Sequence, residues 1–127
     1  MSDLRGNIAI VGTAESDLGT VAPDMSPIDL VAQGIVRALD DCGLELKDVD
    51  GLFAAMSQSR MVALSTAEYL GIQPSYFDST QIGGSSFMAH ITHAQAAVAA
   101  GLCEVVVVAY GSTQRSVSRA AASAREP

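Results

Sequence analysis

Four short apolar runs alternate along this chain with three segments of helical periodicity. The runs span residues 8–12, 49–55, 76–82 and 105–108, and helices are expected over residues 26–43, 60–70 and 86–102. Alternation with short links is typical of βαβ units. The predicted order is therefore β-α-β-α-β-α-β. We expect an α/β domain in which a mostly parallel sheet carries helices on both faces.

Composition limits the class of protein and of partner. The 127 residues suit one domain, and 49% hydrophobic against 17% charged residues indicate a globular chain, not a disordered one. A net charge of −7 argues against a nucleic-acid partner gripped through its phosphate backbone. Arg115, Arg119 and Arg125 gather near the end of the chain. They offer a local anion contact, but a solvated tail is the favoured interpretation.

The two cysteines and the N-terminus bear on the cellular compartment. Cys42 and Cys103 form neither a disulfide framework nor a CxxC metal pair, and residues 1–5 contain no apolar signal region. The longest apolar stretch, residues 96–110, is interrupted by Gly101 and Glu104 and is too short to span a membrane. We therefore expect a cytoplasmic protein in a reducing compartment, with no membrane partner.

The first helix has sequence signals at both ends. Ser26 is suited to the N-cap, Pro27 to the first helical position, and Asp29 to the positive end of the helix dipole. Gly43 fits the C-terminal cap. These residues predict a helix that begins at about Ser26 and ends at Gly43.

The third helix has no charged face. One side carries an apolar stripe of Phe87, Met88, Ile91, Val98 and Leu102, and the opposite side carries Ser86, His90, His93, Ala97 and Ala100. A helix on the surface of a small domain normally shows charges on its outer side. We therefore expect this helix to be covered on both sides, by a second domain or by another subunit.

Several segments together resemble the N-terminal half of thiolase-superfamily proteins. They are residues 8–13, 43–44, 48–52, 83–87, 90–101 and 105–112. The similarity is closest to the sterol-carrier or lipid-transfer thiolase-like branch, whose members are often labelled acetyl-CoA acetyltransferases. It extends over nearly the whole chain up to Ser112. No single motif carries it, but the joint order and spacing of the segments are specific.

The resemblance implies a fold, an assembly and a division of the chain. Family members contain two βαβαβαββ halves stacked in five layers, and the helix after the nucleophile is the buried middle layer. Residues 1–112 would form a thiolase-like domain with a mixed sheet, and residues 113–127 the start of a loop region or a flexible tail. Members usually dimerise, and residues 76–82 would lie near the two-fold axis. Association with a second-half subunit would be the alternative.

The nucleophilic cysteine of a working thiolase is missing. A helix N-terminus stabilises the attacking thiolate, and the resulting thioester divides a difficult cleavage into two steps. By the resemblance, the nucleophile position falls on Gly84 or on Ser85, depending on where a one-residue gap is placed. Cys103 lies at the far end of the same helix, roughly 27 Å away at about 1.5 Å per residue. The catalytic histidine of the family belongs to the second half.

Serines and histidines near this helix start are the other candidates. Ser85 or Ser86 as a nucleophile would need an adjacent base, so capping of the helix is the favoured interpretation. His90 and His93 have a spacing that suits a metal, but no third ligand is evident and buried histidines at a layer contact are favoured. Together with Gly83 and Gly84, these residues are candidates for lining a substrate cavity. We expect no metal and no cofactor.

Three functions remain open. The first is part of a non-thiolytic enzyme that acts on acyl-CoA thioesters, for example by retro-aldol C–C cleavage of a steroid or lipid side chain, which needs a base and an oxyanion site but no thiolate. The second is a non-catalytic acyl-CoA or lipid carrier, and the third is a structural half-domain that needs a partner. Coenzyme A thioesters enter the first two as ligand. The chain by itself lacks the catalytic cysteine and histidine.

Overall fold

Helix α1 (Pro27–Cys42) begins and ends where its capping residues predict. The Asp29 N–H donates to Ser26 Oγ, and the Ser26 N–H donates to the Asp29 carboxylate, so that both halves of a capping box are present. Gly43 closes the helix in the left-handed region at φ 74°. The prediction from sequence is confirmed at both ends.

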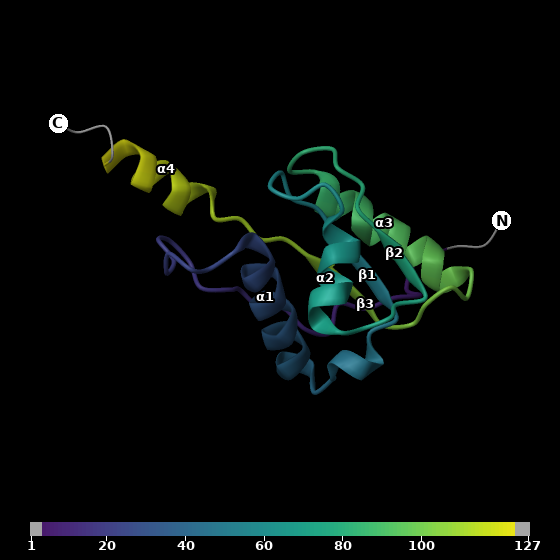
Figure 1. The fold of residues 1–127 in the computed structure, drawn as a ribbon. Helices are drawn as coiled ribbons and strands as arrows, with labels where there is room; N and C mark the ends of the chain where they lie inside the picture. Colours follow the sequence, from purple (N-terminus) through teal and green to yellow (C-terminus); the bar gives the residue numbers. More distant parts are fainter. Residues whose placement is uncertain (1–3, 124–127) are drawn as a thin grey trace.

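Three parallel strands form the sheet of the computed structural model, in which residues 4–123 are described. The strands are β1 (Gly51–Ala54), β2 (Tyr76–Asp78) and β3 (Val106–Ala109), in the order β2-β1-β3 (Figure 1). Gly51 is paired with Tyr76 on one side and with Val106 on the other. Each strand follows a helix or precedes one, as the βαβ pattern predicts.

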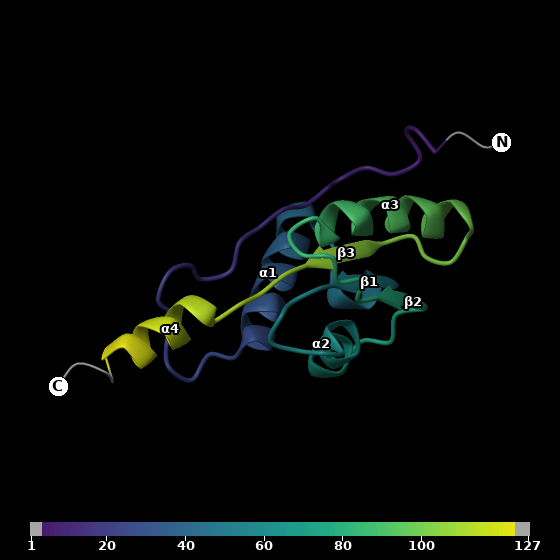
Figure 2. The same cartoon turned by 90° about the horizontal axis from the view of Figure 1, so that it is seen from above.

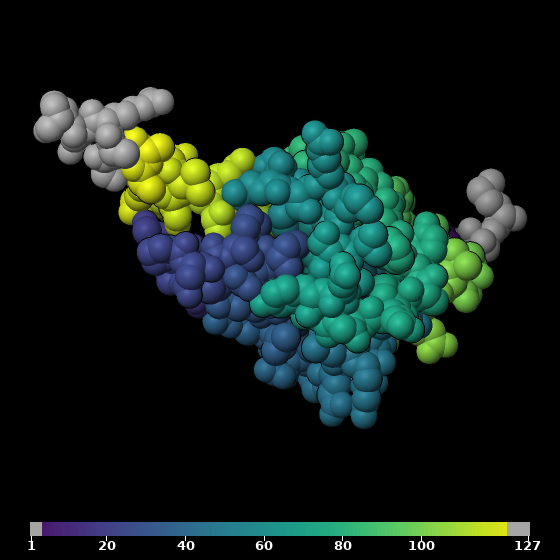
Figure 3. Space-filling model, viewed as in Figure 1, coloured from purple at the N-terminus to yellow at the C-terminus, as the bar shows by residue number. Residues whose placement is uncertain are grey.

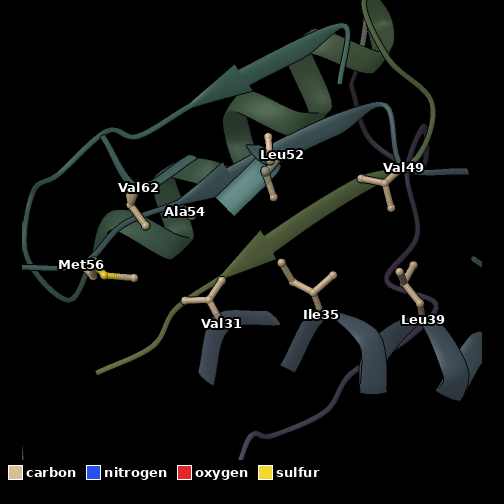
Figure 4. Close-up of a cluster of buried hydrophobic side chains, with 9 residues drawn as sticks. Val31, Ile35, Leu39, Val49, Leu52, Ala54, Met56 and Val62 are labelled. Atoms are coloured by element: carbon tan, nitrogen blue, oxygen red, sulfur yellow. The ribbon is translucent and has the colours of Figure 1, made fainter. Parts of the chain in front are cut away.

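Helices cover both faces of this sheet. Helices α1 and α2 (Val62–Leu70) lie on one face, and α3 (Ser86–Ala99) lies on the other (Figure 2). A short 3₁₀ helix, η1 (Leu46–Asp48), joins α1 to β1. The apolar core lies between the sheet and the α1–α2 layer (Figure 4), where its buried residues are Val31, Ile35, Leu39, Val49, Leu52, Ala54, Met56, Val62 and Ala67.

The first predicted strand is absent from the sheet. Residues 8–12 are extended but pair with no strand, and Ile10 and Val11 are 72% and 64% exposed. This prediction of a buried strand is wrong for the described residues. The apolar pattern required a neighbouring strand, and an apolar cleft occupies the space between residues 8–12 and β3.

Helix α3 buries polar and small side chains and leaves part of its apolar stripe exposed. The small and polar side, with Ser86, His90 and Ala97, is buried against the sheet. The apolar stripe is divided. Ile91 and Val98 line the apolar cleft, whereas Met88 is 72% exposed and Leu102, just after the helix, is 47% exposed. The polar side of the helix is thus covered, and its apolar stripe is covered only in part by the described residues.

A fourth helix, α4 (Gln114–Ser123), was not predicted. It projects from the body of the molecule (Figure 3), and its contacts with the rest include the bonds from Val21 N to Ser116 Oγ and from Arg119 to Thr20 Oγ1. Arg115 and Arg119 both lie on this helix, whereas Arg125 is outside the described residues. The helix carries one large apolar residue, Val117, and this residue is exposed, so the sequence offers no stripe of buried apolar residues there.

Candidate functional site

The turn between β2 and α3 contains the residues that sequence analysis singled out. All three strands are parallel, so this turn lies at the carboxyl edge of the sheet, where α/β proteins commonly bind ligands. Gly83 adopts a backbone φ of 78°, a conformation that residues with a Cβ atom rarely adopt. Ile82 forms a bridge with Gly84. Gly84 and Ser85 are both exposed at the start of α3.

Ser86 holds this turn together. Its buried hydroxyl donates to the Gly83 carbonyl at 2.7 Å and accepts from the Ile82 N–H at 2.9 Å. The hydroxyl proton is therefore committed to a carbonyl, and no base is bonded to this oxygen. Ser85 occupies the N-cap position but its side chain makes no capping bond. The prediction that these serines cap α3 is wrong, because the turn uses Ser86 Oγ and leaves Ser85 in solvent.

The two thiols lie away from the turn. Cys103 is buried directly before β3 and packs close to Gly51, and burial raises the pKa of its thiol. Cys42 is the last residue of α1, and its thiol donates to the Leu39 carbonyl. Neither cysteine can act at the start of α3, as the sequence predicts.

Asp78 and His93 form a hydrogen-bonded pair beside the turn. His93 Nδ1 lies 3.0 Å from Asp78 Oδ2, with the two side chains 38% and 30% exposed. The Thr80 N–H and hydroxyl also donate to this carboxylate, at 2.9 and 2.8 Å. Partial burial acts to raise the pKa of Asp78, but the bonds from Thr80 and His93 outweigh it and leave that pKa below its usual value. The carboxylate orients one histidine nitrogen, so Nε2 is the nitrogen left for a ligand.

His90 is fully buried next to this pair. Its ring packs against Phe53, Phe87 and His93, at centroid distances of 5.5, 6.2 and 6.1 Å. Neither ring nitrogen has a hydrogen-bond partner of ordinary geometry. Burial lowers the pKa of His90, while the nearby Asp78 carboxylate and the Thr80 carbonyl act in the opposite direction. Burial thus favours the neutral form of the ring inside the α3–sheet contact.

Sequence analysis found the histidines but missed their partners. The sequence predicts a longer strand over residues 76–82, whereas β2 ends at Asp78 and an Asx turn follows. An aspartate two residues before a threonine at a predicted strand end was the available signal. No group of three or more His, Cys, Asp and Glu residues suited to a metal occurs within residues 4–123.

A second set of hydrogen bonds at the carboxyl edge of the sheet was also not predicted from the sequence. Gln58 follows β1, and its Oε1 accepts from the Thr113 N–H at 2.9 Å and from the Ser112 hydroxyl at 3.1 Å. Its Nε2 donates to Thr113 Oγ1. These bonds join the loop after β1 to the loop after β3 and fix the point at which α4 leaves the body.

The apolar cleft is separate from these groups. It has a volume of about 770 Å³ and is lined by residues 7–16, α1, β3 and the side of α3 that carries Ile91 and Val98. None of the six predicted cavity residues lines it. Among the described helices, none is long and apolar enough to cross a membrane.

Comparison with known proteins gives two curated relatives. The 17-hydroxy-3-oxo-4-pregnene-20-carboxyl-CoA lyase of Mycobacterium tuberculosis is 34% identical over 117 residues, which is 91% of this chain and 30% of that protein. A steroid side-chain-cleaving aldolase of Thermomonospora curvata is 33% identical over 119 residues, or 91% and 29%. The chain thus spans about 30% of the length of these relatives. No profile of a known protein family matches it.

Solved structures show the same half-fold. An Ltp2–ChsH2(DUF35) aldolase superposes with a TM-score of 0.65 and 30% identity, over 83% of this chain and 27% of that one. A monomeric SCP2-thiolase-like protein type 1 from Mycobacterium smegmatis gives a TM-score of 0.62 and 25% identity, over 78% and 22%. The predicted α/β half-fold is therefore confirmed by its structural neighbours.

Proposed function

We propose that this chain, a thiolase-superfamily domain of the lipid-transfer branch that lacks the nucleophilic cysteine, is part of a lyase for the side chain of a steroid or lipid CoA thioester. The reaction would be a retro-aldol cleavage of a C–C bond. The observation that carries the proposal is the 34% identity to a 17-hydroxy-3-oxo-4-pregnene-20-carboxyl-CoA lyase over 91% of the chain.

The missing thiol agrees with this chemistry. In a retro-aldol step a base takes the proton of the hydroxyl that is β to the thioester carbonyl. The hydroxyl-bearing carbon becomes a ketone, its bond to the α-carbon breaks, and the electron pair moves into the thioester enolate. An acid then protonates the enolate at carbon to give the shortened acyl-CoA. No covalent acyl-enzyme forms, so Gly84 and Ser85 can stand where a thiolase needs cysteine.

The carboxyl edge would supply the floor of the substrate cavity. Gly83, Gly84 and Ser85 bring the backbone close to a ligand, and the N-terminus of α3 favours the negative charge of an enolate oxygen. Ser86 holds this floor in place through its bonds to Ile82 and Gly83. These residues orient a thioester and contribute no thiolate.

His93 is the acid–base group that this chain would offer. Asp78 fixes its Nδ1 and its side chain is partly exposed, so Nε2 can face a ligand. His90 would support that ring from the buried side, at a centroid distance of 6.1 Å. The remaining catalytic groups, like the coenzyme A contacts, would come from the rest of the fold. The substrate is the thioester, and the reaction as written requires no metal or other cofactor.

A partner layer is part of the proposal. The exposed Met88 on α3 and Leu102 just after it would pack against a second half of the fold, and residues 1–112 would form the domain that receives it. The free edge of β2, where Phe77 is 46% exposed, would pair across a dimer axis. The helical segment after residue 113 would begin the connecting loop region.

The test is a cleavage assay on the complete protein in which this chain occurs. The substrate is 17-hydroxy-3-oxo-4-pregnene-20-carboxyl-CoA, and the products to be measured are a 17-keto steroid and propionyl-CoA. Both should appear in equal amounts without added free coenzyme A. Release that requires free coenzyme A would instead indicate thiolysis. Tight binding of the thioester with no product would favour the acyl-CoA carrier function, for which the size of the apolar cleft is the supporting observation.

His93→Gln tests the residue assignment separately. We expect the variant to lower kcat at least tenfold with little change in KM, since it removes a proton-transfer group and not a binding surface. The matched control is Thr92→Gln, an exposed position on the same helix at which the Asp78–His93 pair is kept. Equal kcat values for His93→Gln and the unmodified protein would contradict the role of His93 without contradicting the lyase activity.

A further inference from the structure

Tyr110 is an exposed aromatic residue at the carboxyl edge of the sheet. It follows directly after β3, and its ring meets the ring of Phe87 edge-on, with centroids 5.4 Å apart. Phe87 lies in the first turn of α3, about 3 Å along the helix axis from Ser85. Tyr110 is nevertheless 55% exposed. Its ring thus lies beside the turn that would form the floor of the substrate cavity.

Ring contacts link Tyr110 to the Asp78–His93 pair. Phe87 packs against His90 at 6.2 Å, and His90 packs against His93 at 6.1 Å. The inner members of this row are covered, since Phe87 is half-buried and His90 is fully buried. The two end members, Tyr110 and His93, both reach solvent. One packed cluster therefore presents an aromatic side chain and the candidate acid–base group at the carboxyl edge.

The backbone on both sides of Tyr110 is held in place. Ala109 before it is the last residue of β3 and is paired in the sheet. Gly111 after it is buried against the start of α1, where an added Cβ would lie 2.7 Å from the Pro27 carbonyl oxygen and 2.7 Å from the Val31 side chain. A side chain on a fixed backbone loses little freedom when a ligand binds to it, so Tyr110 is preorganised for a contact.

A second tyrosine of equal exposure gives the comparison. Tyr69 is 56% exposed, and its hydroxyl donates to the Asp29 carboxylate at 2.6 Å, which joins α2 to α1. The Tyr110 hydroxyl bonds to no residue in the part of the chain that the structure describes, 4–123. The position of Tyr69 is thus explained by a bond within the chain, whereas that of the exposed half of Tyr110 is not.

We propose that Tyr110 is a specificity-determining residue whose ring contacts the fused-ring skeleton of a steroid CoA thioester. This inference rests on the proposed lyase function, and it adds the residue that selects a polycyclic acyl group over a short one. The thioester would lie over Gly84 and Ser85, and the skeleton would extend from there across the ring of Tyr110. A tyrosine ring is a large, rigid contact surface with little side-chain entropy to lose, which suits a rigid alicyclic ligand.

The surroundings of Tyr110 favour the apolar half of the substrate over the coenzyme A half. Its ring neighbour Phe87 and its chain neighbours Ala109 and Gly111 have neither a charge nor a side-chain hydrogen-bond donor. The phosphates of coenzyme A would need cations or N–H donors. Adenine can also stack on a tyrosine ring, so a contact with coenzyme A is the alternative that an experiment must distinguish.

The test measures equilibrium binding to the complete protein, so that it gives a result whether or not the ligand is cleaved. One ligand is 3-oxo-4-pregnene-20-carboxyl-CoA, which lacks the hydroxyl that cleavage requires. The other is propionyl-CoA, which carries no ring system. Tyr110→Ala should weaken binding of the steroid thioester about tenfold, because the ring contact is lost, and binding of propionyl-CoA less than twofold.

Two control variants separate the ring from the hydroxyl and from general surface effects. Tyr110→Phe keeps the ring, and Tyr69→Ala removes a tyrosine of the same exposure from α2. Both should bind each thioester within twofold of the unmodified protein. Equal losses for the two thioesters in Tyr110→Ala would indicate a contact with coenzyme A and contradict the proposal, as would unchanged affinities. A loss in Tyr110→Phe as large as in Tyr110→Ala would show that the hydroxyl, not the ring, is recognised.

The same measurements distinguish this inference from the lyase function. If Tyr110→Ala behaves as expected but the 17-hydroxy thioester is not cleaved, the lyase function fails and the ring contact stands. If cleavage occurs and Tyr110→Ala binds both thioesters normally, the ring contact fails alone. If the unmodified protein binds neither thioester, both are overturned.

The thermal midpoint of each variant separates a binding role from a packing role. Because more than half of Tyr110 is exposed, Tyr110→Ala should lower the midpoint by no more than Tyr69→Ala does. A larger fall in Tyr110→Ala, together with unchanged affinities for both thioesters, would show that polypeptide covers the ring in the complete protein. That result would overturn the proposal.

Discussion

The two sides of the sheet differ in what they bury. On the α1–α2 side, Leu52 and Val31 are fully buried in an apolar cluster that the chain closes by itself. On the α3 side, the buried residues include Ser86 and His90, while the larger apolar residue Met88 is left outside. One side is thus a finished core, and the other is a layer whose apolar stripe is covered only in part.

This difference indicates which parts of the sequence serve the chain's own folding. The α1–α2 side follows the ordinary rule that apolar side chains go inward. The α3 side departs from that rule, because the helix leaves Met88 exposed and keeps two imidazoles near the sheet. A helix of this kind is suited to the middle of a stack of layers, where both of its sides are buried.

The largest effect is expected from shortening one leucine on the finished side. Leu52→Ala should lower the free energy of unfolding by about 2–5 kcal/mol, since the side chain is fully buried and leaves a cavity. Leu102→Ala is the matched control at 47% exposure and should change it by less than about 0.5 kcal/mol. Urea denaturation of both variants measures the difference, and equal losses would remove the distinction between the two sides.

An intermediate effect of opposite sign is expected at His90. Replacing it by phenylalanine should stabilise the isolated chain by about 1 kcal/mol, because two buried nitrogens without partners disappear and the ring contacts with Phe53 and Phe87 remain. The measurement is the thermal midpoint of the isolated chain at pH 7. A loss of stability would mean that the imidazole nitrogens are bonded in solution.

The lowered pKa of His90 also predicts that the stability of the chain depends on pH. Its folded pKa is lowered by burial, so the unfolded state binds a proton more readily. The stabilising contribution of the neutral ring is present above the unfolded pKa of about 6.5 and is lost as the pH falls below it. Between pH 7 and pH 5 the unmodified chain should lose more stability than His90→Phe, by at most about 1.4 kcal/mol per pH unit. Parallel pH profiles would contradict this.

A smaller loss is expected when the carboxylate that orients His93 is removed. Asp78→Asn keeps an acceptor for the Thr80 N–H but gives up the charged bond to His93, at a cost of about 1 kcal/mol for this partly exposed pair. The Asp78 pKa is lowered, so its contribution is present above about pH 3.9 and is lost at lower pH. Asp24→Asn, on an exposed loop, is the control for loss of charge alone.

The position of the ring gives an independent measurement for this variant. In the unmodified chain the Nδ1 of His93 is bonded to Asp78, and its ¹⁵N chemical shift should report that bond. The shift should change in Asp78→Asn and stay unchanged in Asp24→Asn. An unchanged shift in both would show that Asp78 does not hold the ring.

The sequence predicted the elements that are determined locally. The Ser26 and Gly43 caps and the alternation of strands and helices depend on neighbouring residues, and the structure confirms them. The resemblance to thiolase-like proteins is confirmed by the structural neighbours. The prediction of a buried strand at residues 8–12 is wrong, because the pairing of these residues depends on a neighbouring strand that no described residue supplies.

The candidate site was only partly predictable for a related reason. The spacing of His90 and His93 on one helix indicates a pair of histidines, but Asp78 binds His93 through a contact across 15 residues that periodicity does not report. The orientation of α3 was also unpredictable in detail. A helical wheel identifies the two sides of α3, but it does not tell which side packs on the sheet. That choice depends on the layer that covers the opposite side of the helix.

The smallest effect on the isolated chain is expected on the open side, and it gives the most specific comparison. Met88→Lys should change the free energy of unfolding of the chain alone by less than about 0.5 kcal/mol, because the side chain is 72% exposed. In the complete protein the same change should be strongly destabilising if a further layer covers α3, since a charge would then be buried. Met61→Lys, on the α1–α2 side, should be neutral in both. Thermal midpoints of the two variants, alone and in the complete protein, measure the difference. If Met88→Lys leaves the thermal midpoint unchanged both in the chain alone and in the complete protein, the outer side of α3 is ordinary solvent-exposed surface. No further layer would then cover α3, and the proposed difference between the two sides of the sheet would not extend to the outer side of this helix.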